Sequence, residues 1–249
     1  MIATLRAALV LLNFFVATCV FGGSVLVAAF LRVKDRPGSV YDWAPRWWGI
    51  THLFWGGARV VEHDTHHKQG AQHIFVANHL GNFDVFALAA KLPWIKFVAK
   101  AELFRIPLFG PAMLRAGMIP IERANRKAAF KSYESATERI QRGASVAVYP
   151  EGTRGYEYAL RPFKKGPFVL AIQAQAPVVP VLVYGALDAQ RKGEFKVHPT
   201  TLHLHYLPAI PTAGLTYDDR DALARRTYEA MAECLRTRYG VESPPYKPG

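Results

Sequence analysis

The 249-residue sequence contains only two cysteines, Cys19 and Cys234, and they lie far apart. Cys19 falls inside a long apolar run. Two cysteines at this separation provide neither the ligand spacing of a zinc site nor a disulfide framework. The sequence therefore excludes a scaffold held together by disulfides and fits a reducing compartment.

Several motifs of known chemistry are also missing. The sequence has no Gly-x-Ser-x-Gly turn, and neither cysteine has a histidine partner in its sequence context, which argues against a serine or cysteine nucleophile. No phosphate-binding glycine loop and no nucleic-acid-binding motif occurs. A hydrolase that activates water and a noncatalytic anion-binding protein stay open as alternatives.

Acidic residues are scarce. The 19 Asp and Glu residues stand against 31 Lys and Arg residues, which gives a net charge of +12. A surplus of this size suits an anionic partner such as nucleic acid, an anionic membrane surface or a phosphorylated substrate. Because no nucleic-acid motif is present, we expect no nucleic-acid partner, and an anionic surface of membrane lipids and a phosphorylated substrate both stay open.

Residues 7–31 carry no charged side chain. As a helix this run would be about 37 Å long, enough to cross a hydrocarbon core of ~30 Å. Arg6 precedes the run, and Arg32, Lys34 and Arg36 follow it. The sequence therefore predicts a membrane helix with the downstream chain on the cytoplasmic side, which in a bacterium is that face of the inner membrane. A glycine pair within the run leaves a spanning helix and a one-leaflet anchor both open.

The next segment, Tyr41–Val61, is rich in aromatic residues. It holds four of the five tryptophans, namely Trp43, Trp47, Trp48 and Trp55. Tryptophan prefers the headgroup level of a membrane, where its ring is apolar and its N–H stays hydrated. The pattern predicts an interfacial helix, with an aromatic-rich core helix as the alternative.

From residue 62 onward, apolar runs typical of strands alternate with helical patterns. The predicted strands are His73–Ala77, Ile95–Ala99, Met118–Glu122, Ser145–Tyr149, Val178–Val183 and Thr201–Leu207. The predicted helices are Phe83–Lys91, Arg126–Arg142, Lys165–Ala174 and Asp218–Tyr239. Strands separated by helices indicate an α/β fold with a largely parallel or mixed sheet flanked by helices. We therefore predict a membrane-anchoring module (residues 1–61) and a globular domain (residues 62–249).

A histidine and an aspartate lie on either side of a glycine directly after the first of these strands. On an ideal helix the five-residue spacing would put His79 and Asp84 about 140° apart, so they can meet only if a turn near Gly81 leads from strand to helix. Asp84 would then lie in the first helical turn and hold one imidazole nitrogen while the other faces a substrate. We interpret the pair as a candidate general base, with an incidental contact as the alternative.

Basic residues follow three other predicted strands. Tyr149–Arg154 ends a strand with a proline, a glycine and an arginine whose planar fork suits phosphate. Gly117–Arg123 and Lys100 likewise place a cation at a strand end. Open α/β sheets bind ligands at the carboxyl ends of their strands, so these residues are candidates for an anion site. The alternatives are a polar turn for Tyr149–Arg154, a surface salt bridge for Arg123 and a solvated side chain for Lys100. The histidine-rich loop Glu62–His67 has no closing set of ligands, so we predict no metal site there.

Four sequence blocks occur in an order that resembles the glycerophospholipid acyltransferase family, and within it the 1-acylglycerol-3-phosphate acyltransferases. The first is Asn-His followed by Asp (residues 78–84), and the second is Gly117–Arg123. The third, Pro150–Arg154, is the most specific, and the fourth is Val179–Val181. The resemblance spans roughly residues 62–210 and implies that residues 62–249 form an acyltransferase domain.

The resemblance implies a reaction. His79 would take the proton of an acceptor hydroxyl that attacks a fatty-acyl thioester, and Asp84 would orient the imidazole. The acceptor would be the sn-2 hydroxyl of lysophosphatidic acid, with another lysolipid as the alternative, and the product would be phosphatidic acid. The implied substrate-binding residues are Lys100, Arg123 and Arg154 for the phosphate and Glu151, Gly152 and Thr153 for the glycerol. Acyl-CoA or acyl-acyl-carrier-protein would be the co-substrate, with no cofactor and no metal.

Three residues depart from the family pattern. Gly81 stands where serine is frequent, and Pro120 stands where an aromatic residue is common. Tyr149 replaces the usual phenylalanine or valine before Pro150. None of these changes removes a chemical group from the predicted base pair, but the first two bear on the shape of the acceptor site.

Overall fold

The computed structural model describes residues 1–70, 72–122 and 126–248, with the backbone alone for residues 126–131. Within this part of the chain, seven strands form one sheet in the order β1-β7-β6-β2-β5-β3-β4. Their bounds are β1 Ala58–His63, β2 Ile74–Ala77, β3 Ile95–Lys100, β4 Ile119–Ile121, β5 Ser145–Val148, β6 Val178–Tyr184 and β7 Thr200–Tyr206. Every neighbouring pair is parallel except β6 and β7. The predicted α/β fold with a largely parallel or mixed sheet is confirmed.

The central strands are buried on both faces because they separate two apolar cores. In β2, Ile74 and Val76 belong to one core, and Phe75 and Ala77 belong to the other. This division follows from the alternation of side chains along a strand. It also explains why the central strands read as unbroken apolar runs in the sequence.

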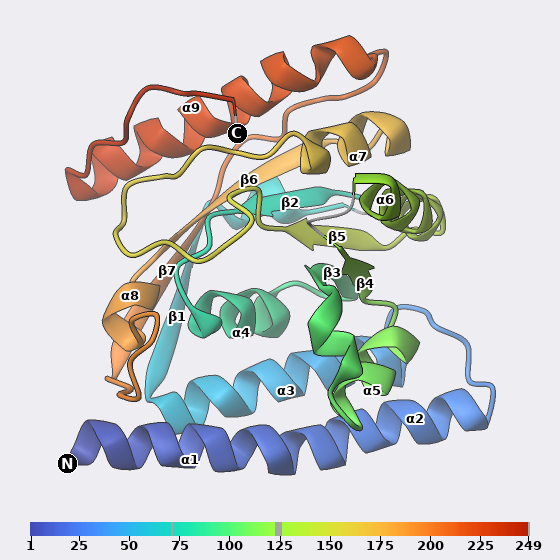
Figure 1. The fold of residues 1–249 in the computed structure, drawn as a ribbon, viewed down its shortest axis with the longest axis vertical. Coiled ribbons are helices and arrows are strands. Elements are labelled where there is room, and N and C mark those ends of the chain that lie inside the picture. Colours follow the sequence, from blue (N-terminus) through green and yellow to red (C-terminus); the bar gives the residue numbers. More distant parts are fainter. Residues whose placement is uncertain (71, 123–125, 249) are drawn as a thin grey trace.

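Helices cover both faces of the sheet (Figure 1). On one face lie α6 (Arg126–Gln141), α7 (Gly166–Ala174) and α9 (Arg220–Tyr239). On the other lie α4 (Asn82–Lys91) and, beneath it, α3 (Val40–Gly56), with α5 (Phe109–Arg115) beside them. A short helix, α8 (Ala186–Ala189), follows β6, and 3-10 turns occupy Thr65–Lys68, Ala101–Arg105 and Tyr217–Asp219. The sequence patterns predicted α4, α6, α7 and α9 but missed α5 and α8.

The N-terminal segment is one helical path beneath α3 (Figure 1). It comprises α1 (Ile2–Ala17), a π-helical turn (Thr18–Gly22) and α2 (Gly23–Phe30). The path spans 29 residues and is long and apolar enough to cross a membrane, with a mean hydropathy of 2.2 over an 18-residue window. The glycine pair does not reverse the chain, because Gly22 and Gly23 both keep right-handed helical backbone angles. Large apolar side chains are exposed along it, including Leu12, Phe15, Val20 and Val27.

The predicted interfacial helix is shorter than expected. Helix α3 ends at Gly56, and Gly57 adopts the left-handed conformation with φ of 66°. The prediction was wrong for residues 58–61, because this left-handed turn sends the chain into β1, which pairs with β7. The division at residues 61 and 62 stays a prediction, although β1 crosses it.

The tryptophans of α3 point in two directions. Trp43, Trp47 and Trp55 are exposed. Trp48 instead packs inward, and its Nε1 donates a hydrogen bond of 3.3 Å to Oγ1 of Thr18 in the N-terminal path. The core interpretation therefore holds for the face that carries Trp48, and the interfacial interpretation stays a prediction for the exposed face.

Candidate active site

His79 and Asp84, here called the dyad, lie on the turn between β2 and α4 and in the first turn of α4. Asn78 fixes the turn to strand β6, because its side chain bonds both backbone groups of Val183, at 2.9 Å to the carbonyl and 2.7 Å from the N–H. The backbone N–H of Gly155 donates to the carbonyl of His79 at 2.8 Å. Two other segments of the chain, β6 and the loop at Gly155, therefore fix the backbone of the turn that carries His79.

Asp84 and His79 meet as the spacing predicted. The Nδ1 atom of His79 lies 3.1 Å from each carboxylate oxygen of Asp84. Oδ2 of Asp84 also accepts the backbone N–H groups of Leu80 (2.7 Å) and Gly81 (2.8 Å). The carboxylate is fully buried, and the imidazole is 16% exposed. A carboxylate held by three donors fixes the tautomer of the ring and leaves Nε2 as the nitrogen free to act on a substrate.

Tyr149 covers one face of the imidazole. The two rings are stacked with centroids 4.2 Å apart and planes 24° apart. Burial and the negative charge of Asp84 raise the pKa of the Tyr149 phenol well above its ordinary value. The tyrosine is therefore a neutral wall beside the dyad.

Glu151 lies behind His79. It is 4% exposed, and its Oε1 accepts the backbone N–H of His79 at 2.8 Å. Burial raises the pKa of this carboxyl to about 7, against the opposing effect of the His79 N–H. Gly152 follows in a left-handed turn with φ of 72°. Neither residue lines the cavity described next, so their predicted contact with the glycerol stays a prediction, while Glu151 supports the turn that carries His79.

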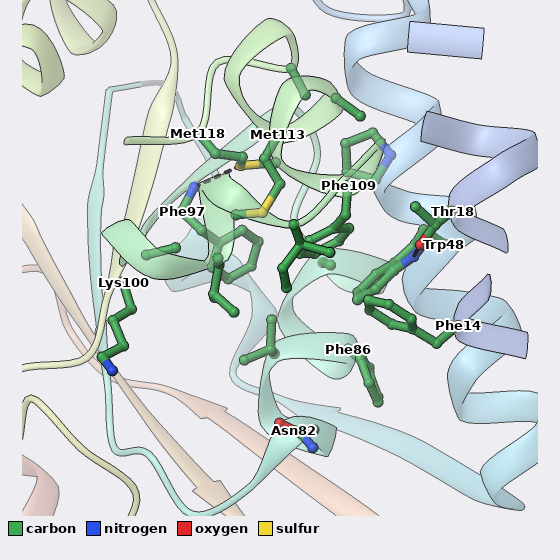
Figure 2. A pocket seen from close by; sticks show the side chains of 18 of the residues that line it. Phe14, Thr18, Trp48, Asn82, Phe86, Phe97, Lys100, Phe109, Met113 and Met118 are labelled. Atoms are coloured by element: carbon green, nitrogen blue, oxygen red, sulfur yellow. Dashed lines mark hydrogen bonds between the residues drawn. The ribbon is translucent and has the colours of Figure 1, made fainter. Parts of the chain in front are cut away.

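His79 opens onto a cavity of about 580 Å³. Its entrance is polar and includes His79, Asn82, Thr153, Arg154, Lys192 and Lys100. Its interior is apolar and is walled by residues of the N-terminal path, α3, α4, β3, α5 and the turn before β4. Among them are Phe14, Phe21, Val25, Trp48, Phe86, Phe97, Phe109, Met113 and Met118. Figure 2 shows Phe14 and Trp48 on the side of the N-terminal helices, with Asn82 and Lys100 lying away from them. The volume is typical of a small-molecule site.

The predicted cations lie in different settings. Arg154 is at the entrance, where its Nη1 lies 3.4 Å from the side-chain oxygen of Asn82. Lys100 also borders the cavity, but its ammonium pairs with Glu102 at 3.1 Å and is 57% exposed. Arg123 lies outside the described residues. Sequence reasoning missed Lys192, because no motif and no predicted element marked the loop after α8.

The histidine-rich loop does not reach this cavity. His63 closes β1, and its Nε2 lies 3.0 Å from Nδ1 of His203 on β7. His66 and His67 fall in the 3-10 turn that follows. Among the residues that the structure describes, no three metal-ligating side chains are grouped closely enough to hold an ion.

Comparisons with known proteins identify the family of this chain. A family model described as Acyltransferase matches residues 59–184. The 1-acyl-sn-glycerol-3-phosphate acyltransferase of Limnanthes douglasii is 36% identical over 213 residues, which cover 85% of this chain and 74% of the relative. The human 1-acyl-sn-glycerol-3-phosphate acyltransferase alpha is 35% identical over 190 residues, which cover 75% of this chain and 66% of the relative.

A solved structure shares the fold. The crystal structure of the 1-acyl-sn-glycerophosphate (LPA) acyltransferase PlsC from Thermotoga maritima matches with a TM-score of 0.73 and 24% identity, covering 92% of this chain and 96% of that one. The region matched by the family model includes the dyad, Tyr149 and Arg154. The chain therefore belongs to the acyltransferase family and is an O-acyltransferase of the 1-acylglycerol-3-phosphate type.

Proposed function

We propose that this enzyme transfers a fatty-acyl group from a thioester to the sn-2 hydroxyl of 1-acylglycerol-3-phosphate and forms phosphatidic acid for phospholipid synthesis. One observation carries the proposal: a hydrogen-bonded His79–Asp84 pair stands where a cationic entrance meets an apolar cavity. The names of the two relatives suggest the acceptor, because each is a 1-acyl-sn-glycerol-3-phosphate acyltransferase.

The dyad acts as a general base. Nε2 of His79 accepts the proton of the acceptor hydroxyl while the oxygen attacks the thioester carbonyl. Asp84 stabilises the imidazolium that forms, as in a triad that lacks a protein nucleophile. The C–O bond forms, the C–S bond breaks, and the proton passes from His79 to the departing thiolate. No step requires a metal or a cofactor.

The entrance and the interior bind different parts of the substrates. Arg154 pairs with the acceptor phosphate through its planar fork, and Lys100 and Arg123 are further candidates for that phosphate. The apolar interior takes an acyl chain of the thioester and holds its carbonyl beside His79, where positioning contributes as much as the base. The thioester carrier is coenzyme A or acyl carrier protein.

The N-terminal path and the exposed tryptophans bring the site to lipid. The path is apolar and long enough to cross a membrane, and Trp47 and Trp55 are exposed on the neighbouring helix. Lysophosphatidate then enters from the bilayer and phosphatidate returns to it. The excess of Lys and Arg after the path supports a cytoplasmic location for the catalytic domain.

Purified protein in mixed micelles tests the function. We expect acyl-thioester consumption that depends on lysophosphatidate and yields phosphatidate, with acyl-CoA and acyl-acyl-carrier-protein compared as donors. Thioester consumption without an acceptor would instead identify a hydrolase. A higher kcat/KM for a different lysolipid would reassign the acceptor.

A further inference from the structure

The loop after α8, residues 190–197 and here called the rim loop, is seated between the dyad turn and the membrane helix. The side-chain oxygen of Gln190 accepts a hydrogen bond of 3.4 Å from Nδ2 of Asn82. At the other end of the loop, the N–H of Val197 donates to the carbonyl of Ala3 in α1 at 3.0 Å. The rim loop is thus attached both to the first residue of α4 and to the start of the N-terminal path.

Gly81 permits this close approach. A Cβ atom at Gly81 would lie 3.3 Å from the carbonyl oxygen of Gln190 and 3.5 Å from that of Ala186. The first distance is tighter than ordinary van der Waals contact, so the rim loop would have to shift by a few tenths of an ångström to admit a side chain at Gly81. The departure from the family's frequent serine therefore has a structural consequence: the rim loop packs directly on the dyad turn.

Lys192 is the residue of the rim loop that lines the cavity. It is half-buried and lines the entrance together with His79, Asn82 and Arg154. Its Nζ donates to the backbone carbonyl of Arg154 at 3.4 Å and lies 4.3 Å from the ring centroid of Tyr156. An ammonium group has three donors, so these contacts order the side chain and still leave donor capacity for a ligand.

The charge of Lys192 is not neutralised by the protein. Over the described ranges, no carboxylate lies within ion-pair distance of Lys192 or of Arg154, whereas Lys100 is paired with Glu102. Two half-buried cations that share an entrance and have no acidic partner repel one another, and an anion between them would relieve that repulsion. A phosphate supplies both the charge and the acceptor oxygens.

We propose that Lys192 is a phosphate-binding residue that acts with Arg154 at the cavity entrance. This inference rests on the proposed function, because it assigns a further residue to the same site. The phosphate belongs either to the lysophosphatidate headgroup or to the nucleotide of an acyl-CoA donor. The attachment of the rim loop to α1 favours the headgroup, since that acceptor arrives from the membrane.

The test compares three variants of the full-length enzyme. Lys192→Met removes the charge and keeps the length, Lys192→Arg keeps the charge, and Lys196→Met is the control, because Lys196 is exposed on the same loop and does not line the cavity. Initial rates are measured against lysophosphatidate and against acyl-CoA. A monoacylglycerol acceptor and an acyl-pantetheine donor serve as the phosphate-free counterparts.

We expect Lys192→Met to raise the KM for the phosphate-bearing substrate roughly tenfold with kcat changed less than about twofold, since hydrogen bonds to charged groups contribute at least this much. Lys192→Arg should restore most of the affinity, and Lys196→Met should match the wild type. A rise in KM for lysophosphatidate alone assigns the headgroup. A rise for acyl-CoA that disappears with acyl-pantetheine assigns the nucleotide.

Two outcomes overturn the inference. The first is no change in either KM. The second is an equal loss of rate with phosphate-free and phosphate-bearing substrates, which would give Lys192 only a structural role. The proposed function fails separately, if the wild-type enzyme does not acylate lysophosphatidate; the same comparison then uses whichever phosphate-bearing acceptor is turned over.

Discussion

The two ends of the cavity are built in different ways. At the entrance, His79 is fixed by hydrogen bonds to Asp84 in the same turn and to Glu151, which follows the neighbouring strand β5. At the apolar end, the wall consists mainly of apolar side chains from the N-terminal path, α3, α4 and α5. The dyad at the entrance therefore depends on local geometry and charge, whereas the interior depends on how distant helices dock.

The largest loss of activity should come from a substitution of His79 at the entrance. His79→Ala should lower the acyl-transfer rate by roughly 10²–10⁴-fold with little change in KM, because it removes the base and leaves the binding groups in place. Steady-state rates with lysophosphatidate measure this. His66→Ala, in the exposed turn after β1, is the matched control and should be silent. Turnover near the wild-type level in His79→Ala would contradict the assignment.

Glu151, which supports the turn that carries His79, should make the stability of the fold depend on pH. The folded enzyme holds the Glu151 carboxyl at a pKa of about 7, above its ordinary value of 4.5. Between these values the folded state keeps a proton that the unfolded state releases, so stability falls as pH rises from about 4.5 to 7. A shift of this size corresponds to about 3 kcal/mol at most.

Glu151→Gln removes that titration. The Tm of the variant minus the Tm of the wild type should increase by roughly 5–10 °C as pH rises from 5 to 7. Above pH 8 this difference should stay constant. Thermal unfolding in detergent across this range measures the gap. Glu157→Gln, at an exposed position in the same loop, is the control. A gap that does not change with pH would show that Glu151 has no raised pKa.

The contrast between the two ends also explains what could be predicted from the sequence. The meeting of His79 with Asp84 followed from their spacing and a glycine, because a strand, a turn and a helix are local structures. The inward position of Trp48 did not follow, because it depends on Thr18 in a helix 30 residues earlier. Lys192 was missed for the same reason, since its loop is placed by contacts to Asn82 and Ala3 that no local pattern encodes.

The apolar end can be changed through the glycine pair. Gly22 lines the cavity, and a Cβ there would lie 3.2 Å from Cβ of Ala112 on α5. Gly23, its neighbour, would meet nothing within 4 Å. Gly22→Leu should therefore narrow the interior and lower kcat/KM for the longest accepted acyl chain about tenfold relative to a shorter one, the effect of one or two methylenes in an apolar pocket.

Gly23→Leu is the matched control for that change, because it adds the same side chain and the same helix propensity one residue away. Rates across a series of acyl-chain lengths should be unchanged in Gly23→Leu and shifted toward short chains in Gly22→Leu. Equal chain-length profiles in the two variants would show that the interior does not hold the acyl chain.

The smallest effect should arise where the two ends meet, at Tyr149, which lines the cavity and stacks on His79. Its buried hydroxyl has no partner with hydrogen-bond geometry among the described residues, although Asp84 is close enough to raise the phenol pKa. Tyr149→Phe keeps the stacked ring and removes only that hydroxyl, so we expect a rate within about threefold of wild type and a stability equal or up to ~1 kcal/mol higher. Tyr149→Ala removes the ring as well and should cost more in kcat, because the imidazole then loses the surface that fixes its plane. A Phe variant as impaired as the Ala variant would mean that the hydroxyl, and not the ring, serves the dyad.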